Sequence, residues 1–371
     1  MMTAFVPIMT RSAREVTPIR TLVVDDSVVV RTVIERILNA DARFVVVHKT
    51  NSAEQAMHYL ADHEVDLVLL DIELPGQSGL AALPAILRTS HRVKVAILSG
   101  KCEEGSAAAV EALALGASDI LSKPGSGSFG EQFPQALIER LTRLFGGGMA
   151  AVSADPVPPP ARVASPALQP LACLGVGAST GGIHALGQLF AGMAEPLGVP
   201  ILLTQHLPAS FTVYFAQQLA RMTSLRVKVA ENGDLLMPDT VYLAPGDANL
   251  LVRRGLHGRV MAVLSPERTP AGNLPGVDPM FASMAGAYGA GAAGIVLTGM
   301  GRDGTVGARD IVAAGGWIVA QDEASSVVWG MPGFVARAGL ADRVLALSAM
   351  AGEIVTRVRS GRLAIAARMA R

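Results

Sequence analysis

The segment between residues 146 and 170 most limits what this chain of 371 residues can fold into. It reads GGGMAAVSADPVPPPARVASPALQP, with three consecutive glycines, six prolines and almost no apolar periodicity. Glycine makes the backbone flexible and clustered proline stiffens it toward polyproline II, so this segment is expected to be a semi-extended linker without a core of its own. The chain is therefore expected to form two globular units, residues 19–145 and residues 171–360, joined by the Gly/Pro-rich linker 146–170.

Before the linker, short apolar runs with strand character alternate with helical stretches. Five such units predict an α/β fold, in which a parallel sheet carries helices on both faces. The expected strands are residues 21–24, 44–47, 65–70, 93–98 and 119–121. No glycine-rich dinucleotide fingerprint follows the first strand, which ends in two aspartates instead.

After the linker, the runs LACLGVGAS, PILLTQH, AGIVLTG and GWIVAQD again have the character of buried strands, and helical stretches follow most of them. They predict a second doubly wound, mostly parallel α/β domain. Shorter alternating runs around NGD, PGD and HGR predict β-hairpins added to this sheet within residues 226–265. Residues 1–18 and the Arg-rich tail after Ala351 are expected to be disordered.

The balance of charge excludes one class of partner. Lys and Arg together number 31, as do Asp and Glu. Residues 1–150 contain 14 basic and 17 acidic side chains (net −3), and the remainder contains 17 and 14 (net +3). Neither half has the basic excess typical of proteins that bind nucleic acid or an anionic membrane, so no nucleic-acid partner is expected.

One stretch without charge, residues 279–301, is long enough to cross a bilayer. Its glycines divide it into a helix-like FASMAGAY and a strand-like AGIVLTG, so a helix–turn–strand unit of a soluble core is expected instead. Residues 1–20 mix charges with short apolar stretches and do not form a signal peptide. The chain is therefore expected to be cytoplasmic, with no direct membrane insertion.

Five polar side chains follow the predicted strands of the first half. They are Asp25 and Asp26 after the first strand, Asp71 after the third, Ser99 after the fourth and Lys123 after the fifth. The carboxyl ends of parallel strands meet at one edge of a sheet, so these side chains should lie together. Three carboxylates in one cleft repel each other, and Mg²⁺, which prefers oxygen ligands, would relieve the repulsion. One carboxylate could then attack a phosphoryl group, while the lysine and the hydroxyl bind the transferred oxygens.

The motifs LVVDDS, LLDIELPG, ILSG and LSKP, in this order, resemble the receiver domain of two-component response regulators. The resemblance implies a flavodoxin-like (βα)5 receiver domain over residues 19–145. It also implies that Asp71 is the phosphoacceptor and that Ser99 and Lys123 are the switch residues. The implied Mg²⁺ ligands are Asp25, Asp26, Asp71 and the backbone carbonyl of Glu73.

The second half contains a serine on a glycine-rich turn. GASTGG follows a predicted strand and precedes a helical stretch, so Ser179 should be exposed near backbone N–H groups that can receive an oxyanion. Alone, this motif fits a structural or phosphate-binding loop equally well. His206 ends the next predicted strand and should emerge at the same edge, where it can remove the serine proton. His184 is a rival, but it would have to fold back over its own helix.

A third group should orient the imidazole and stabilise its charged form. Asp303 follows the strand AGIVLTG on the glycine-rich turn GMGRDG, and Asp322 ends the strand GWIVAQD. Both residues lie at the carboxyl end of a predicted strand. Spacing and composition do not choose between them.

The motifs GASTGG, QHLP, GMGRDG and VWGMPG, after a receiver domain and a linker, resemble the CheB-type chemotaxis protein-glutamate methylesterases. The resemblance implies that Ser179 is the nucleophile, His206 the general acid/base and Asp303 its partner. It implies hydrolysis of glutamyl γ-methyl esters on chemoreceptors with release of methanol, deamidation of receptor glutamines, and no metal in this reaction. It further implies a chemotaxis histidine kinase as the phosphodonor.

The layout of a switch domain tethered to an enzyme suggests how the halves are coupled. We expect the unphosphorylated first domain to cover the Ser179 edge, and phosphorylation of Asp71 to weaken that contact. Two alternatives are an output domain that binds DNA, which the lack of a helix-turn-helix pattern disfavours, and a non-catalytic output in which Ser179 is only a turn residue.

Overall fold

The computed structural model describes residues 17–89, 93–99, 106–123, 132–145, 170–193, 195–270 and 272–369. The predicted linker, apart from Pro170, lies outside these residues, as do residues 1–16 of the segment that we expected to be disordered. Within the described residues, all strand pairings in the two main sheets are parallel, which confirms the α/β prediction for both halves.

The first half is a five-stranded sheet with the order β2-β1-β3-β4-β5. All five predicted strands are present, as β1 (Ile19–Val24), β2 (Phe44–Thr50), β3 (Leu67–Asp71), β4 (Lys94–Ser99) and β5 (Asp119–Ser122). The helices are α1 (Val28–Asn39), α2 (Ala53–Asp62), α3 (Gly79–Thr89), α4 (Ser106–Leu115) and α5 (Gln132–Leu144).

Alternate residues along these strands point to opposite helical layers. Leu22 and Val68 pack in the cluster that includes α2, α3 and α4, whereas Val23 and Leu69 pack in the cluster that includes α1 and α5. Because both faces are covered, the central strands are mainly apolar in sequence, as in LVLLD of β3 and KVAILS of β4. Polar side chains are therefore concentrated where the strands end.

The second half is a seven-stranded sheet with the order β14-β13-β12-β6-β7-β9-β8. Its strands are β6 (Cys173–Ala178), β7 (Ile201–Gln205), β8 (Arg226–Val229), β9 (Thr240–Leu243), β12 (Ala292–Val296), β13 (Trp317–Gln321) and β14 (Arg343–Leu345). The helices are α6 (Gly182–Ala191), α7 (Ala209–Met222), α8 (Val277–Tyr288), α9 (Thr305–Ala313), α10 (Met331–Arg337) and α11 (Leu347–Met369), with short 3₁₀ turns at η1 (Leu256–Gly258) and η2 (Gly289–Gly291).

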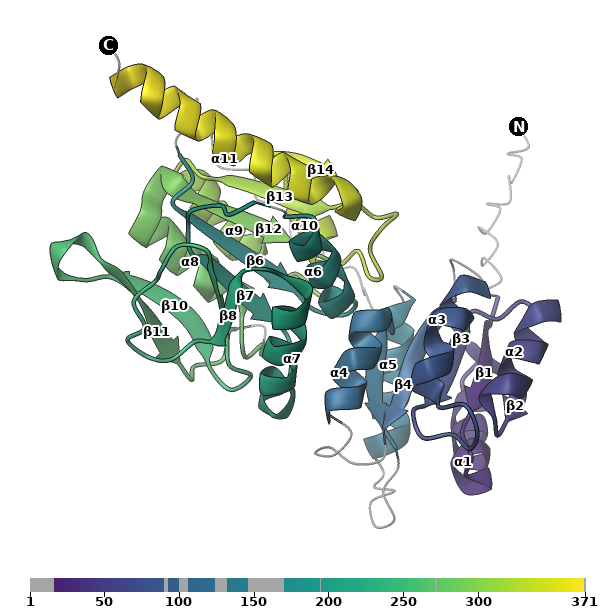
Figure 1. Cartoon of the computed structure of the whole chain (residues 1–371). Coiled ribbons are helices and arrows are strands. Elements are labelled where there is room, and N and C mark those ends of the chain that lie inside the picture. The colour runs from purple at the N-terminus through teal and green to yellow at the C-terminus, as the bar shows by residue number, and fades with distance from the viewer. Residues whose placement is uncertain are drawn as a thin grey trace, which may run out of the picture.

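The prediction of hairpins within residues 226–265 is correct for only part of that region. β10 (Asn249–Arg254) and β11 (Val260–Ser265) form an antiparallel pair, which projects on the side away from the first half (Figure 1). β8 and β9 instead join the main sheet and pair in parallel. Turn residues such as NGD and PGD determine where the chain bends but not which strand it meets next, so the sequence pattern could not separate the two cases.

The prediction that the tail after Ala351 is disordered is wrong, because α11 continues through it. Leu347, Met350, Ile354 and Val358 recur at helical spacing and are buried in one apolar cluster with residues of α6. These positions form one apolar face of the helix. The arginines between them in the sequence made this pattern hard to recognise.

The charge-free stretch of residues 279–301 lies in α8, η2 and β12, as expected for a helix–turn–strand unit. No helix among the described residues is long and apolar enough to cross a membrane.

The two halves meet through α4, which packs against α6 and α7 (Figure 1). Val110 and Ala114 of α4 belong to the same buried cluster as Leu186 of α6. Beside this apolar contact, Lys94 Nζ at the start of β4 donates a hydrogen bond across the interface to the carbonyl of Val327 (2.7 Å). These contacts hold the first half against the second sheet at the carboxyl end of β6, where α6 begins.

Candidate active site

The acidic side chains predicted at the edge of the first sheet do lie together. Carboxylate oxygens of Asp25, Asp26 and Asp71 are all within 4.8 Å of one another. Lys123 Nζ lies 2.6 Å from Asp71 Oδ2 and 2.9 Å from Asp25 Oδ2. Burial raises the pKa of Asp71. The hydrogen bond from Lys123 lowers this pKa, but by less than burial raises it. Burial disfavours the charged ammonium of Lys123, yet its hydrogen bonds to these carboxylates raise the pKa of that lysine.

The donor set of this cluster fits a hard divalent cation such as Mg²⁺, which takes carboxylate oxygens and waters as ligands. Asp25 and Asp71 are buried, while Asp26 is exposed and leaves the cluster open to solvent. Glu73 N donates to Asp71 Oδ1 (3.1 Å), which keeps the Glu73 backbone next to the cluster. Ser99 ends β4, and its carbonyl accepts a hydrogen bond from Lys123 N (2.7 Å).

Ser179 lies in the turn between β6 and α6. Gly181 has a φ of +75°, and a Cβ atom there would lie 2.5 Å from Val327 Cγ2. A Cβ atom on Gly182 would lie 2.3 Å from Gln205 Oε1. The Ser179 carbonyl accepts hydrogen bonds from Gly182 N (2.7 Å) and Gln205 Nε2 (2.9 Å). The two glycines thus allow the strand to turn sharply into the helix, with Ser179 at the bend.

His206 directly follows β7, the neighbour of β6 in the sheet. Its backbone N donates to the Ala178 carbonyl (3.0 Å), so the histidine lies at the same edge as Ser179. The imidazole Nε2 is 2.7 Å from Asp303 Oδ2, which leaves Nδ1 as the ring nitrogen for a serine proton. Among the described residues no hydrogen bond joins Ser179 Oγ to the ring, although both side chains line the same pocket.

The Asp303 carboxylate is surrounded by N–H donors. Besides the His206 ring, Val277 N lies 2.8 Å from Oδ2, while Asp278 N and Gly304 N lie 2.9 and 3.0 Å from Oδ1. Burial disfavours the charged form, but the hydrogen bonds from His206 and the backbone lower the pKa of Asp303. Asp303 is therefore ionised and can orient the imidazole.

The two rival residues lie in other contacts. His184 Nδ1 is 2.8 Å from the carbonyl oxygen of Ala114 in α4, and its Nε2 is 2.7 Å from Gln188 Nε2. Asp322 Oδ1 accepts hydrogen bonds from the backbone N (3.0 Å) and the hydroxyl (2.6 Å) of Ser325. His184 thus joins the two halves of the chain, and Asp322 stabilises a turn after β13.

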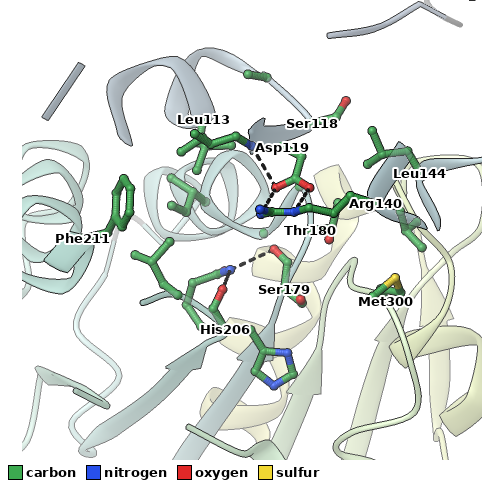
Figure 2. Close-up of a pocket in the computed structure, with 18 of the residues that line it drawn as sticks. Leu113, Ser118, Asp119, Arg140, Leu144, Ser179, Thr180, His206, Phe211 and Met300 are labelled. Atoms are coloured by element: carbon green, nitrogen blue, oxygen red, sulfur yellow. Dashed lines mark hydrogen bonds and ion pairs between the residues drawn. The ribbon is translucent and has the colours of Figure 1, made fainter. Parts of the chain in front are cut away.

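Ser179 and His206 open into a pocket of about 380 Å³ between the two halves of the chain (Figure 2). Its lining from the second half includes Thr180, Phe211 and Met300, and its lining from the first half includes Leu113, Asp119, Arg140 and Leu144. Arg140 and Asp119 form an ion pair (3.0 Å) across from the serine turn. A hydroxyl, an imidazole and an ionised carboxylate at one pocket are the groups that nucleophilic acyl transfer requires.

Sequence analysis did not identify Gln205, whose amide fixes the Ser179 carbonyl. It is only 4 % exposed although it is polar. The available signal was a polar side chain at the last position of an apolar strand, next to a candidate histidine. Asp278 was also missed, although an acidic residue at the start of a predicted helix can bind a neighbouring backbone.

Comparison with known proteins gives two family matches. Residues 174–354 match the CheB methylesterase model, and residues 21–128 match the response regulator receiver domain. A Caulobacter vibrioides protein named protein-glutamate methylesterase/protein-glutamine glutaminase 2 is 40% identical over 349 residues, covering 92% of this chain and 99% of its own length. A Nocardioides protein named protein-glutamate methylesterase/protein-glutamine glutaminase is 42% identical over 352 residues, covering 92% of this chain and 95% of its own.

Among solved structures, the Thermotoga maritima CheB methylesterase catalytic domain is 33% identical, with a TM-score of 0.49. The similarity covers 50% of this chain and 98% of that one.

Proposed function

Because the chain belongs to the CheB methylesterase family, we propose that it is a phosphorylation-activated hydrolase that removes the methyl groups of glutamate γ-methyl esters on chemoreceptors. The names of its relatives also support a second activity, the deamidation of receptor glutamines. Its partners are then methyl-accepting chemoreceptors as protein substrate and a chemotaxis histidine kinase as phosphodonor, which places it in the cytoplasm. The methylesterase match over residues 174–354 supports an esterase as the output domain over a DNA-binding or a non-catalytic one.

In the proposed mechanism, Ser179 Oγ attacks the ester carbonyl while His206 Nδ1 takes the hydroxyl proton. The carbonyl π electrons move to oxygen, and backbone N–H groups at the start of α6 stabilise the oxyanion. The oxyanion then collapses, the C–O bond to the methoxy group breaks, and the protonated His206 gives its proton to the departing methoxy oxygen, which leaves as methanol. Asp303 holds the ring through Nε2 and stabilises its charged form.

Water completes the cycle. His206 removes a proton from a water molecule that attacks the glutamyl–Ser179 ester, and it returns that proton to the serine as the glutamate leaves. With a glutamine substrate the same steps release ammonia in place of methanol. In this proposal the steps use Ser179, His206, Asp303, backbone N–H groups and water.

The observation that carries the proposal is the 2.7 Å hydrogen bond between His206 Nε2 and the buried Asp303 carboxylate, beside Ser179 on a tight glycine turn. A histidine with only a structural role would not need an ionised partner at one ring nitrogen and an open pocket at the other side.

Methanol release from methylated receptor membranes tests the proposal. Ser179→Ala should reduce the rate to the uncatalysed background, because the nucleophile is lost. Ser210→Ala is the matched control, since Ser210 also lines the pocket but has no proposed role, and it should keep the native rate. Native methanol release by Ser179→Ala would rule out the esterase mechanism.

At the acidic cluster, Asp71 is the proposed phosphoacceptor: its carboxylate attacks the phosphoryl group while the bond from phosphorus to the donor breaks and the donor leaves. In this proposal the Lys123 ammonium, which lies 2.6 Å from Asp71 Oδ2, and the Ser99 hydroxyl bind the transferred oxygens. The proposed Mg²⁺ ligands are Asp25, Asp26, Asp71 and the backbone carbonyl of Glu73. When bound, Mg²⁺ would screen the carboxylates and the incoming phosphoryl charge.

We assign residues 19–145 to the receiver domain, 146–170 to the linker and 171–360 to the catalytic domain. Leu113, Asp119, Arg140 and Leu144 of the receiver line one wall of the pocket that contains Ser179, and in this proposal they block the access of a receptor helix. Phosphorylation of Asp71 weakens this contact in the proposed activation. Acetyl phosphate should therefore raise methanol release by the native chain and have no effect on Asp71→Asn.

A further inference from the structure

A second, half-buried carboxyl lies next to the proposed triad and has no part in the mechanism above. Asp278 is in the first turn of α8, and its Oδ1 accepts a hydrogen bond from Gly307 N (2.8 Å) in the first turn of α9. Asp303 precedes α9 and accepts hydrogen bonds from Val277 N and Asp278 N in the first turn of α8. Each carboxyl therefore binds the N-terminus of the helix that belongs to the other.

This reciprocal arrangement serves two helices that have glycine at the capping position. Gly276 precedes α8 and Gly304 precedes α9, and neither residue has a side chain that could accept from the free N–H groups. The helices also approach closely, since a Cβ atom on Gly307 would lie 2.4 Å from the Asp278 carbonyl oxygen. The position of the Asp303 side chain thus depends on how α9 is held against α8.

The two carboxyls differ in charge. Burial, together with the nearby Asp303 carboxylate, raises the pKa of Asp278 to about 7, whereas the pKa of Asp303 is lowered. Two ionised carboxylates in one buried site repel each other, so a shared proton resides on Asp278. The negative charge then stays on Asp303, the carboxylate in contact with His206.

We propose that Asp278 is a positioning residue for the triad, because its carboxyl holds the first turn of α9 against α8 and so fixes the Asp303 carboxylate beside His206. This inference rests on the proposed function of Ser179, His206 and Asp303. The hydrogen bonds of Asp278 run to Asp303 and to α9, so it acts on the reaction through Asp303.

Two substitutions in the full-length chain test the proposal. Asp278→Ala removes the acceptor for Gly307 N, so we expect kcat for methanol release to fall about 100-fold, as for a catalytic group misplaced by roughly 1 Å. KM should change by less than about twofold, because Asp278 is not among the residues that line the pocket beside Ser179. Asp278→Asn keeps an acceptor oxygen and is neutral like the protonated acid, so kcat should stay within about threefold of native.

Asp342→Ala is the matched control. Asp342 Oδ2 also accepts from a backbone group, Ile318 N (2.8 Å), but it does so at the amino ends of β13 and β14, the opposite edge of the sheet from the triad. This variant should lose thermal stability as Asp278→Ala does and retain native kcat. A smaller folded fraction would also lower the apparent kcat at constant KM, so kcat is expressed per folded protein, and Asp342→Ala then shows what a loss of stability alone does.

Two results would overturn the inference: native kcat in folded Asp278→Ala, or an equal loss in Asp278→Asn and Asp278→Ala. Either could occur while Ser179→Ala remains inactive, and the proposed triad would then stand without Asp278. Methanol release by Ser179→Ala at the native rate would instead remove the proposed function itself.

Discussion

Asp303 and Asp322 follow neighbouring strands of one sheet, and their surroundings give them different chemistry. α8 directs its first backbone N–H groups at Asp303, which leaves that carboxylate ionised and in contact with His206. Asp322 instead accepts hydrogen bonds from the backbone N and the hydroxyl of Ser325 in its own turn. At the scale of the residue, the helix N-terminus is what converts a strand-end aspartate into a candidate catalytic partner.

Asp303→Asn should therefore lower kcat for methanol release by about 10⁴-fold, because an amide cannot stabilise the imidazolium and favours the wrong ring tautomer. Asp322→Asn is the matched control and should lose less than about threefold, since its carboxyl only stabilises a turn. The measurement is methanol release with both proteins folded to the same extent. The opposite order of activities would identify Asp322 as the partner of His206.

Much of the site can be predicted from the sequence at this scale, because alternating strands and helices place every strand-end residue at one edge. Ser179, His206 and both aspartates were candidates for that reason. The choice of Asp303 could not be made from spacing, since it depends on Val277 and Asp278 in a helix that precedes the strand. Here the resemblance to a known family supplied what local pattern did not.

At the scale of the element, the turn into α6 depends on Gly181. Its φ of +75° and the 2.5 Å approach of a Cβ atom to Val327 make any side chain there strained. Gly181→Ala should cost about 1–3 kcal/mol of stability and displace Ser179, with a loss of activity to match. Urea unfolding and methanol release measure the two effects.

Gly233 provides the control for this prediction. It also has a positive φ, +91°, but a Cβ atom there meets nothing within 4 Å. Gly233→Ala should therefore show the backbone strain alone and keep native activity. If the two variants lost activity equally, the close approach at Gly181 would not be what places the serine.

Helices and strands were predictable where a single local pattern decided them. The apolar runs of β3 and β6 are such cases, since strands covered on both faces have few polar positions to interrupt them. The pairing of β8 with β9 and the packing of α11 on α6 depend on contacts made by distant segments. The apolar spacing along α11 indicates a packing face, but the local sequence does not tell which segment either element will meet.

At the scale of the whole molecule, Lys94 connects the receiver to the catalytic domain. Its Nζ donates hydrogen bonds to the carbonyls of Leu144, at the end of α5, and Val327, in the loop before α10. Lys94→Met keeps the volume and removes both bonds. Only the bond to Val327 crosses the interface, and at about 1 kcal/mol for one hydrogen bond the docking equilibrium shifts by roughly fivefold. Methanol release by the unphosphorylated chain should rise by up to that factor.

Lys49→Met is the matched control, because Lys49 pairs with Glu35 inside the receiver. It should leave the unphosphorylated rate unchanged. With acetyl phosphate, all three proteins should reach the same rate, since the contact is then already weakened. An unphosphorylated rate of Lys94→Met equal to native would show that this lysine does not hold the domains together.

The same lysine gives a dependence on pH. Burial lowers the pKa of Lys94 to about 8, against 10.5 in the unfolded chain, so the unfolded chain binds this proton more tightly. The free energy of unfolding should therefore increase with pH between about pH 8 and pH 10.5, and Lys94→Met should lack this increase. Urea unfolding of both proteins across this range measures it, and parallel curves would contradict the buried ammonium.

The pocket beside Ser179 takes its walls from two domains, and this has a consequence for inhibitor discovery. A compound that touches Thr180 and Arg140 at once has a complete binding site only while the domains are docked. Thermodynamic linkage then requires that phosphorylation lower the affinity of the enzyme for the compound. The factor is the same as the one by which the bound compound opposes activation. Such a molecule would stabilise the docked conformation. Its apparent affinity in a mixture of docked and undocked enzyme would report the fraction that is still docked.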